Sequence, residues 1–259
     1  MSITRHPLDG PTRGALVHRE QIDWHDHARH QLIYPSRGVL QVSTAMGAWV
    51  VPPHRAVWIP ATVAHAHRAH GPTEMLTLAF DAAGELDPLP SDRPTVLAVS
   101  PLLREVIIAL TGQVARAAGP RRNLERVAVD QLRQVEALAL SVPALADDRL
   151  RAISALLADD PADPRSLAEL GTVVGASPRT LSRLFRAQAG MSFAQWRAQT
   201  RLHHSLRLLA SGASVTATAT ACGYGSASAF IQAFRQAFGL TPAKYRKRST
   251  DDDGPPVGP

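Results

Sequence analysis

The 259-residue sequence lacks the features on which secreted and membrane proteins depend. It has a single cysteine, Cys222, which excludes an internal disulfide. It has no run of about 18 apolar residues, which a membrane-spanning helix needs. Residues 1–20 contain charges and two prolines in place of an apolar stretch, so we expect no secretory signal. These absences predict a cytoplasmic protein from a reducing compartment, in which Cys222 is a small core residue.

Acidic residues are nearly absent from the last third of the chain. Residues 165–248 contain twelve Lys or Arg and one acidic residue, Glu169. Residues 1–148 contain fourteen basic and fifteen acidic residues, so the net charge of +6 comes from the C-terminal part. Because a basic surface attracts phosphate groups, this asymmetry favours a nucleic-acid partner.

The same basic segment contains one pattern of seven residues twice, with the copies 49 residues apart. The first copy is Leu181, Phe185, Arg186, Gly190, Ser192, Trp196 and Arg197, and the second is Phe230, Phe234, Arg235, Gly239, Thr241, Tyr245 and Arg246. Large apolar, glycine, hydroxyl and arginine positions each recur as the same type. This repetition indicates the duplication of one supersecondary unit.

Each copy predicts two short helices joined by a turn that contains glycine. In the first copy Ser166 is the expected N-cap of a short helix, Gly175 breaks the pattern and Pro178 opens a second helix. The apolar residues of that helix recur at i, i+3, i+4 and i+7, which leaves its arginines on the opposite face. The second copy predicts helices over 215–221 and 226–238, and a longer helix over 193–211 joins the two pairs. Such pairs are typical of helix-turn-helix motifs, whereas the alternative is two solvated helical hairpins with an arginine-rich surface.

Residues 166–247 resemble the DNA-binding domain of AraC/XylS-type transcription regulators. The match rests on the run 177–185 and, in the second copy, on Cys222, Gly223, Tyr224, Ser226, Phe230, Phe234, Arg235, Gly239, Thr241, Pro242 and Tyr245. Gly171 departs from the pattern because alanine is usual there, and a glycine inside a helix costs about 1 kcal/mol. The AraC pattern has a proline at the position of Phe193, and the second copy of the repeat has that proline, Pro242, at the equivalent position.

The resemblance implies that the second helix of each pair enters DNA. The residues expected to contact DNA are Arg179, Ser182, Arg183 and Arg186 in the first pair and Ala227, Ser228, Gln232 and Arg235 in the second. Because an arginine can read guanine through two hydrogen bonds, we expect the first pair to supply more of the base discrimination. Arg235 is expected to contact the DNA backbone.

Residues 12–80 predict short strands separated by Pro, Gly or Ser, as in a small β-barrel or sandwich. Nine of the eleven histidines lie within the first 70 residues. Two motifs in this region resemble those of the cupin barrel: His25, His27, Gln31 and Gly38, then Pro60, Thr62 and His65. Gln31 stands where the cupin pattern has glutamate, and Thr62 stands where it has glycine.

These histidines form a candidate metal site. Because side chains alternate along a strand, His25 and His27 lie on the same side of it. Together with His65 and the amide oxygen of Gln31 they offer the ligands of one divalent metal ion. A neutral amide is a poorer ligand than a carboxylate, so a polar pocket for an organic effector, or histidines on a barrel rim, are alternatives. His30, His54, His67 and His70 are expected at solvent-exposed or hydrogen-bonded surface positions.

The remaining segments suggest how the domains are arranged. After a loop over 81–94, one apolar stripe contains Leu102, Val106, Leu110 and Val114, and another contains Leu124, Val127, Gln131, Val135 and Leu138. Such stripes normally pack on their own domain, and the AraC resemblance implies that this helical hairpin can also form a dimer interface. Residues 141–143 are expected to be a linker. The predicted units are a cupin-like effector and dimerisation domain over 1–143, a double helix-turn-helix domain over 149–248 and a disordered tail over 249–259.

We therefore expect an α+β protein with an N-terminal cupin-like β-barrel, a helical hairpin and a C-terminal all-α domain. The expected function is that of a sequence-specific, homodimeric transcription regulator that binds double-stranded DNA, responds to a small-molecule or metal effector and is not an enzyme. One alternative is a metal-dependent cupin enzyme fused to a DNA-binding domain. Another is a DNA-binding architectural protein whose barrel only dimerises.

Overall fold

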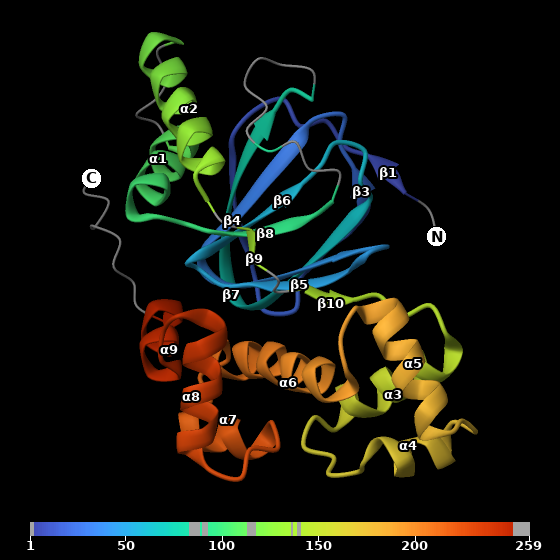
Figure 1. Ribbon diagram of the computed structural model, residues 1–259. Helices are drawn as coiled ribbons and strands as arrows, with labels where there is room; N and C mark the ends of the chain where they lie inside the picture. The colour runs from blue at the N-terminus through green and yellow to red at the C-terminus, as the bar shows by residue number, and fades with distance from the viewer. Residues whose placement is uncertain are drawn as a thin grey trace.

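The computed structural model describes residues 3–82, 89, 93–112, 118–135, 137–138 and 141–250. The strands are β1 (Thr4–Arg5), β2 (Thr12–Leu16), β3 (Gln21–Asp26), β4 (His30–Thr44), β5 (Gly47–Val51), β6 (Arg55–Ile59), β7 (His65–Phe80), β8 (Thr95–Ala98), β9 (Ala137–Leu138) and β10 (Ser141–Pro143). The helices are α1 (Pro101–Thr111), α2 (Ala118–Arg133), α3 (Asp148–Asp159), α4 (Leu167–Val173), α5 (Pro178–Ala189), α6 (Phe193–Ala210), α7 (Val215–Ala221), α8 (Ala227–Phe238) and α9 (Pro242–Thr250). Helices α1 and α2 lie beside the sheet, and α3 to α9 form a separate layer below it (Figure 1).

The two longest strands, β4 and β7, organise the sheet. They pair antiparallel from His30 opposite Phe80 to Thr44 opposite His65, and the register shifts between Pro35 and Val39. On one side of this irregularity β7 pairs with β2 and β4 with β6, and β8 and β9 extend the sheet beyond β6; we call this part the distal half. On the other side β7 pairs with β3 and β4 with β5, and β1 and β10 pair with β3 and β5; this part is the proximal half, next to the C-terminal helices.

The expected closed barrel is not present. The strand pairings in the described residues run as one path from β1 to β9, with β2, β5 and β10 as branches, and the path does not return to its first strand. The sheet changes strand partners at the irregular midpoints of β4 and β7. Its two halves fold over each other instead, around an apolar cluster to which both contribute, including Ile33 and Val57 of the distal half and Val42 and Trp49 of the proximal half.

Helices bury the outer faces of both halves. The outer face of the distal half, with Leu32, Trp58 and Leu78, packs on α1 and α2. The outer face of the proximal half, with Val39 and Val50, packs on residues of α6, α8 and α9. This burial on both sides explains why most residues of β4 are buried, including the polar residues Gln31 and Thr44.

The predicted helices of the C-terminal part are all present, with ends within two residues of those expected. Local signals explain this agreement, because serines cap α4, α5, α6, α7 and α8, and Gly190 and Gly239 end α5 and α8 in the left-handed conformation. Cys222 is fully buried, which confirms it as a core residue.

Three expectations about the connecting segments differ from the structure. Residues 141–143 are not a free linker, because they form β10 and pair with β5. Leu102 is 53% exposed, and the buried stripe of α1 is instead formed by Leu103, Val106, Ile107 and Leu110. Helix α9 extends to Thr250, into the segment expected to be disordered, while residues 251–259 lie outside the described residues. The loop over 81–94 and Val114 fall wholly or partly outside them as well.

Gly171 has a steric role that its helix propensity does not reveal. A Cβ atom at this position would lie 2.4 Å from the carbonyl oxygen of Ala176, in the turn that joins α4 to α5. The same turn is closed by a hydrogen bond from Ala176 N to Gly171 O at 2.9 Å. The glycine therefore allows the turn to pack against α4, which offsets its unfavourable helix propensity.

We predict that Gly38→Ala lowers the free energy of unfolding by about 2 kcal/mol or more. Gly38 has a φ of +75° and lies where β4 changes partners, and an added Cβ would lie 2.3 Å from the carbonyl oxygen of Pro72. Equilibrium urea unfolding of the full-length protein measures the change. Gly14→Ala is the matched control, because its Cβ would meet no atom within 4 Å. Equal stabilities of the two variants would contradict the proposed constraint at the bend.

Candidate nucleic-acid interface and metal centre

The first helix pair carries its basic residues on one exposed face. Ser177 caps α5 by accepting a hydrogen bond from Thr180 N, and Leu181 and Phe185 are fully buried. Because the buried residues of α5 recur at helical spacing, the residues between them face solvent. All four side chains predicted to contact DNA from this helix are exposed: Arg179, Ser182, Arg183 and Arg186.

The second helix pair has the same geometry with less charge. Phe230, Phe234 and Phe238 form the buried face of α8. Of the predicted contacts, Ser228, Gln232 and Arg235 are exposed and Ala227 is half-buried. Ile231, which was not among the predicted contacts, is 36% exposed on the same helix. The repeat contained the signal, because Ile231 lies 49 residues after Ser182, and an apolar side chain can contact the methyl group of thymine.

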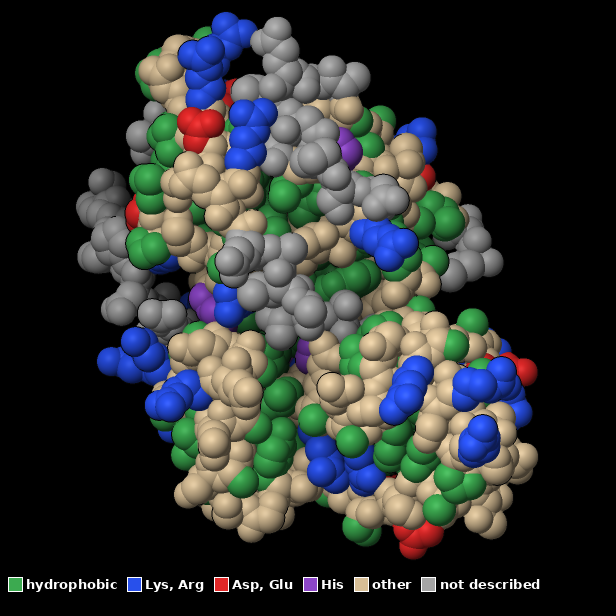
Figure 2. Space-filling view, in the orientation of Figure 1, with side chains coloured by type: hydrophobic (Ala, Val, Ile, Leu, Met, Phe, Trp, Pro, Cys, Tyr) green, Lys and Arg blue, Asp and Glu red, His purple; other side chains and the backbone are tan. Residues whose placement is uncertain are grey.

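Helix α6 lies between the two helix pairs in the chain. Its arginines donate hydrogen bonds to backbone carbonyl groups of the loop between α3 and α4. Arg197 donates to Arg165 O at 2.6 Å, and Arg201 donates to Pro161 O at 2.9 Å. Gly223, in the turn between α7 and α8, packs so closely on Arg201 that a Cβ atom would lie 2.6 Å from its guanidinium. Lys and Arg side chains gather in the recess between the two helical lobes (Figure 2). The two pairs therefore have a fixed spacing, with arginines between them.

Three histidines of the proximal half converge on one point. His25 and His27 come from β3 and the residue after it, and His65 begins β7 directly opposite His25. One ring nitrogen from each of the three lies within 4.8 Å of the others, and all three side chains are buried. The candidate ligands that the sequence placed on separate strands are thus brought together by the pairing of β3 with β7.

Hydrogen bonds to the backbone fix the orientation of each ring. The Nδ1 atoms of His25, His27 and His65 contact the carbonyl oxygens of Asp23, His6 and Val63 at 2.6, 2.9 and 2.9 Å, respectively. Because a carbonyl oxygen only accepts, each Nδ1 carries the proton and each Nε2 keeps its lone pair. Backbone-held imidazoles with free Nε2 lone pairs are the usual arrangement of metal-binding histidines.

Burial favours the neutral rings that a metal needs. It lowers the pKa of His65 to about 4, and it also lowers the pKa of His25. The Nε2 atoms of His27 and His65 are buried and have no hydrogen-bond partner among the described residues. Buried polar atoms without a partner are costly, so these two nitrogens fit a site that is completed by a ligand.

The cupin-like motifs also include Gln31 and Thr62. Gln31 is buried, and its Oε1 atom has no hydrogen-bond partner among the described residues. Thr62 has a φ of +65°, a conformation that favours the glycine of the cupin pattern, and its N–H donates to His27 O at 2.8 Å. The strained turn therefore holds the chain between β6 and β7 against the histidine pair.

His67 was wrongly expected at a surface or hydrogen-bonded position. It is 3% exposed, neither ring nitrogen has a partner among the described residues, and burial lowers its pKa well below the usual value. Its ring lies 5.0 Å from that of His65, and the ring of His6 stacks on His25 at 4.7 Å. The alternation His65, Ala66, His67 was the signal for His67. His30 is hydrogen-bonded as expected, accepting from Ala61 N at 2.9 Å.

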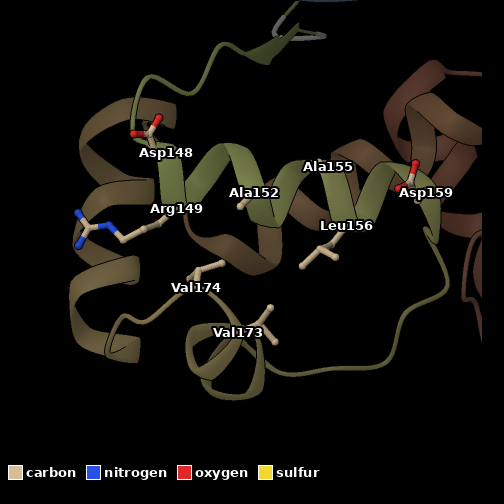
Figure 3. Close-up of a pocket in the computed structure, with 8 residues that line it drawn as sticks. All are labelled: Asp148, Arg149, Ala152, Ala155, Leu156, Asp159, Val173 and Val174. Atoms are coloured by element: carbon tan, nitrogen blue, oxygen red, sulfur yellow. The ribbon is translucent and has the colours of Figure 1, made fainter.

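A shallow apolar recess lies between α3 and α4, where α4 is the first helix of the first pair (Figure 3). It is lined by Ala152, Ala155, Leu156, Val173 and Val174, and the charged side chains Asp148, Arg149 and Asp159 lie toward its ends. Val173 is 57% exposed there.

The C-terminal half matches proteins of known type. A family model described as a helix-turn-helix domain matches residues 170–248. The HTH-type transcriptional regulator NimR of Escherichia coli K12 is 32% identical over 228 residues, which cover 87% of this chain and 82% of NimR. An AraC-like transcription regulator of Streptomyces antibioticus is 35% identical over 104 residues, or 40% of this chain and 34% of that protein. The chain belongs to the AraC-type family of transcription regulators.

This membership makes the chain a DNA-binding transcription regulator, as the sequence predicted. A crystal structure of the AraC-type regulator ToxT of Vibrio cholerae O395 aligns with 93% of this chain and 97% of its own length, at 11% identity and a TM-score of 0.42. In the part of this regulator that the structure describes, no helix is long and apolar enough to span a lipid bilayer.

For the histidine cluster we predict that the full-length regulator binds one divalent ion per chain. His65→Ala should abolish binding, because it removes one of three converging nitrogens. Gln31→Glu should tighten binding about tenfold if the added carboxylate reaches the ion. Isothermal titration with zinc, nickel, cobalt and manganese measures both effects, and His54→Gln is the histidine control. A protein that is metal-free by elemental analysis, with a melting temperature unmoved by these ions, would refute the site.

Proposed function

We propose that this regulator reads DNA with both helix pairs, with α5 and α8 in adjacent major grooves. The observation that carries the proposal is the repeated geometry of the pairs, each with a buried apolar face and an exposed polar face on its second helix. Helix α6 has 18 residues and so spans about 27 Å, close to the 34 Å of one DNA turn. In this arrangement Arg179, Ser182, Arg183 and Arg186 contact the first groove, and Ser228, Ile231, Gln232 and Arg235 contact the second.

Residues 1–143 form the cupin-like sensing unit in this proposal, and residues 149–248 form the DNA-binding unit. The effector is a divalent metal ion held by His25, His27 and His65, with Gln31 as a fourth ligand. Support comes from the three fixed Nε2 lone pairs and from the low pKa of His65, which keeps its ring neutral at pH 7. A small organic effector in the same polar pocket is the alternative. The sensing unit also mediates homodimerisation, and light scattering tests this.

The same three imidazoles also suit a catalytic metal, which normally has three protein ligands and one open position. This is the reason to consider a metal-dependent cupin enzyme as a second function. The 82% coverage of a relative named as a transcriptional regulator favours the sensing role. An activity screen of the metal-loaded protein separates the two, because a sensor changes DNA binding upon metal addition without turning over a substrate.

Footprinting of the full-length protein on its promoter DNA, with and without the bound divalent metal, tests the sensing proposal. A sensor requires different DNA affinities in the two states, since an effector that binds both states equally shifts nothing. An unchanged footprint and an unchanged affinity upon metal addition would leave only a structural role for the metal.

We predict that Arg183→Ala relaxes specificity at one base pair of the operator, with a loss of about 1–3 kcal/mol of discrimination there. The reason is that Arg183 is exposed on the α5 face that enters the groove. Binding of the variant to operators mutated one base pair at a time measures the effect, and Arg122→Ala on α2 is the control. Equal weakening on every sequence would show instead that Arg183 contacts a phosphate.

We also predict that hydroxyl-radical footprinting shows two protected segments about one helical turn apart on one face of the DNA. This pattern follows if α5 and α8 both engage, since α6 holds them at a fixed spacing. Gly223→Leu should weaken the second segment selectively, because its side chain would displace the turn that precedes α8 from Arg201. Protection of one segment in the unaltered protein would mean that a single helix pair binds.

A further inference from the structure

A second recess, between the two helix pairs, contains two arginines of α6, and we call it the arginine recess. Its walls come from the loop before α4, from α6 itself and from the turn before α8, and it has a volume of about 460 Å³. Lys and Arg side chains are visible between the two helical lobes on the face shown in Figure 2. The lining residues are Ala162, Pro164, Ala194, Arg197, Ala198, Arg201, Gly223 and Tyr224.

The two arginines differ in how fully their hydrogen-bond donors are used. Arg201 donates from Nε to Pro161 O at 2.9 Å and from Nη2 to Asp163 O at 3.4 Å, so it is fixed to the loop before α4. Arg197 donates from Nη1 to Arg165 O at 2.6 Å, but its Nε and Nη2 atoms have no partner among the described residues. Because a buried donor without an acceptor is costly, an arrangement that gives these two atoms an acceptor is favoured over the present one.

The nearest carboxylates are already engaged and do not pair with Arg197. Asp163 accepts three hydrogen bonds from the guanidinium group of Arg165, and Asp160 accepts one from the backbone of the loop. Within the part of the chain that the structure describes, no ion pair joins either carboxylate to Arg197. Burial and then the charge of Arg201 lower the pKa of Arg197, more than the two carboxylates raise it. The arginine recess therefore has positive charge that its own walls do not neutralise.

The position of the recess relates it to the DNA between the two half-sites. This relation rests on the proposed function, in which α5 and α8 enter adjacent major grooves. On one face of B-DNA two such grooves are separated by a minor groove, with a ridge of phosphates on each side of it. Tyr224 in the wall of the recess is followed directly by the turn into α8, and Pro164 lies just before α4 of the first pair. The concave recess between the pairs therefore lies opposite the convex ridges of this DNA spacer.

We propose that the arginine recess is a third DNA-binding site, in which Arg197 binds a backbone phosphate of the spacer between the two half-sites. The side chain of Arg197 is half-buried, so its guanidinium group can turn outward through the open recess and donate two hydrogen bonds to phosphate oxygens. Arg201 stays on the loop and adds positive charge. A phosphate contact fixes register and orientation without reading sequence, so Arg197 positions the two helix pairs on the DNA relative to each other.

Replacement of single spacer phosphates by neutral methylphosphonates tests the proposal with the unaltered full-length protein. We expect at least one spacer position at which the neutral group weakens binding by about tenfold, because it removes the charge that the guanidinium binds. Methylphosphonates outside the footprint are the control and should have no effect. If two DNA segments are protected but no spacer phosphate matters, this proposal is overturned and the proposed function stands. Protection of one segment would overturn both.

A variant then assigns the sensitive phosphate to Arg197. Arg197→Gln should bind unmodified DNA about tenfold more weakly, lower the slope of log affinity against log salt by about one, and lose nothing further on the sensitive methylphosphonate DNA. Arg197→Leu should give the same result, and it serves if Arg197→Gln does not fold, because it keeps an apolar contact with the Phe193 ring, which lies 5.6 Å from the guanidinium carbon. Arg122→Gln on α2 is the control. Losses from the variant and from the methylphosphonate that simply add would overturn the assignment to Arg197.

Discussion

The burial of the outer face of the proximal half is the interaction on which the arrangement of this regulator depends. Val39 and Val50 are 0% and 6% exposed only because Phe238, Tyr245 and neighbouring residues of the C-terminal helices cover them. Full burial of an aliphatic or aromatic side chain stabilises the fold by about 1.5–3 kcal/mol, so the shared cluster binds the two parts of the chain firmly. Arg55 also fixes the position of the C-terminal end of α8 on the sheet, because it donates a hydrogen bond to Phe238 O at 3.2 Å.

In the proposed mechanism, this packing gives a short physical route from the sensing unit to DNA. The strand β7 carries the histidine cluster on its inner face and the residues that meet α6 on its outer face, so a single layer of backbone separates them. In the proposed mechanism, a displacement of His65 upon ligand binding displaces the neighbours of α6 unless the strand twists locally. Coupling still requires that the ligand binds one of two conformations of the protein more tightly than the other. The difference between these two binding free energies is the largest change in DNA affinity that the ligand can cause.

The sequence predicted the local structure well and the long-range structure less well, for a physical reason. The ends of α5 and α8 follow from Ser177, Ser226, Gly190 and Gly239, whose effects act within one helical turn. The convergence of His25, His27 and His65 was predicted from the alternation of side chains along a strand and from the resemblance to the cupin motifs. The open sheet did not follow, since it depends on where β4 changes partners. The burial of His67 and the pairing of β10 with β5 were not predicted either, because both depend on strands that are distant in the sequence.

The two helices proposed to read DNA, α5 and α8, differ in what holds them, and the difference follows from the same apolar junction. Helix α5 presents three exposed arginines and packs on α3, whereas α8 presents one arginine with Ser228, Ile231 and Gln232. Attraction to phosphate is therefore concentrated on the first pair and decreases with added salt, as the release of counterions requires. The second pair depends more on being held in place by the sheet through Phe234, Phe238 and Arg55. In the proposed mechanism, a ligand that alters the sheet therefore acts mainly on α8, the helix with less charge of its own, and the second half of the DNA site is the regulated half.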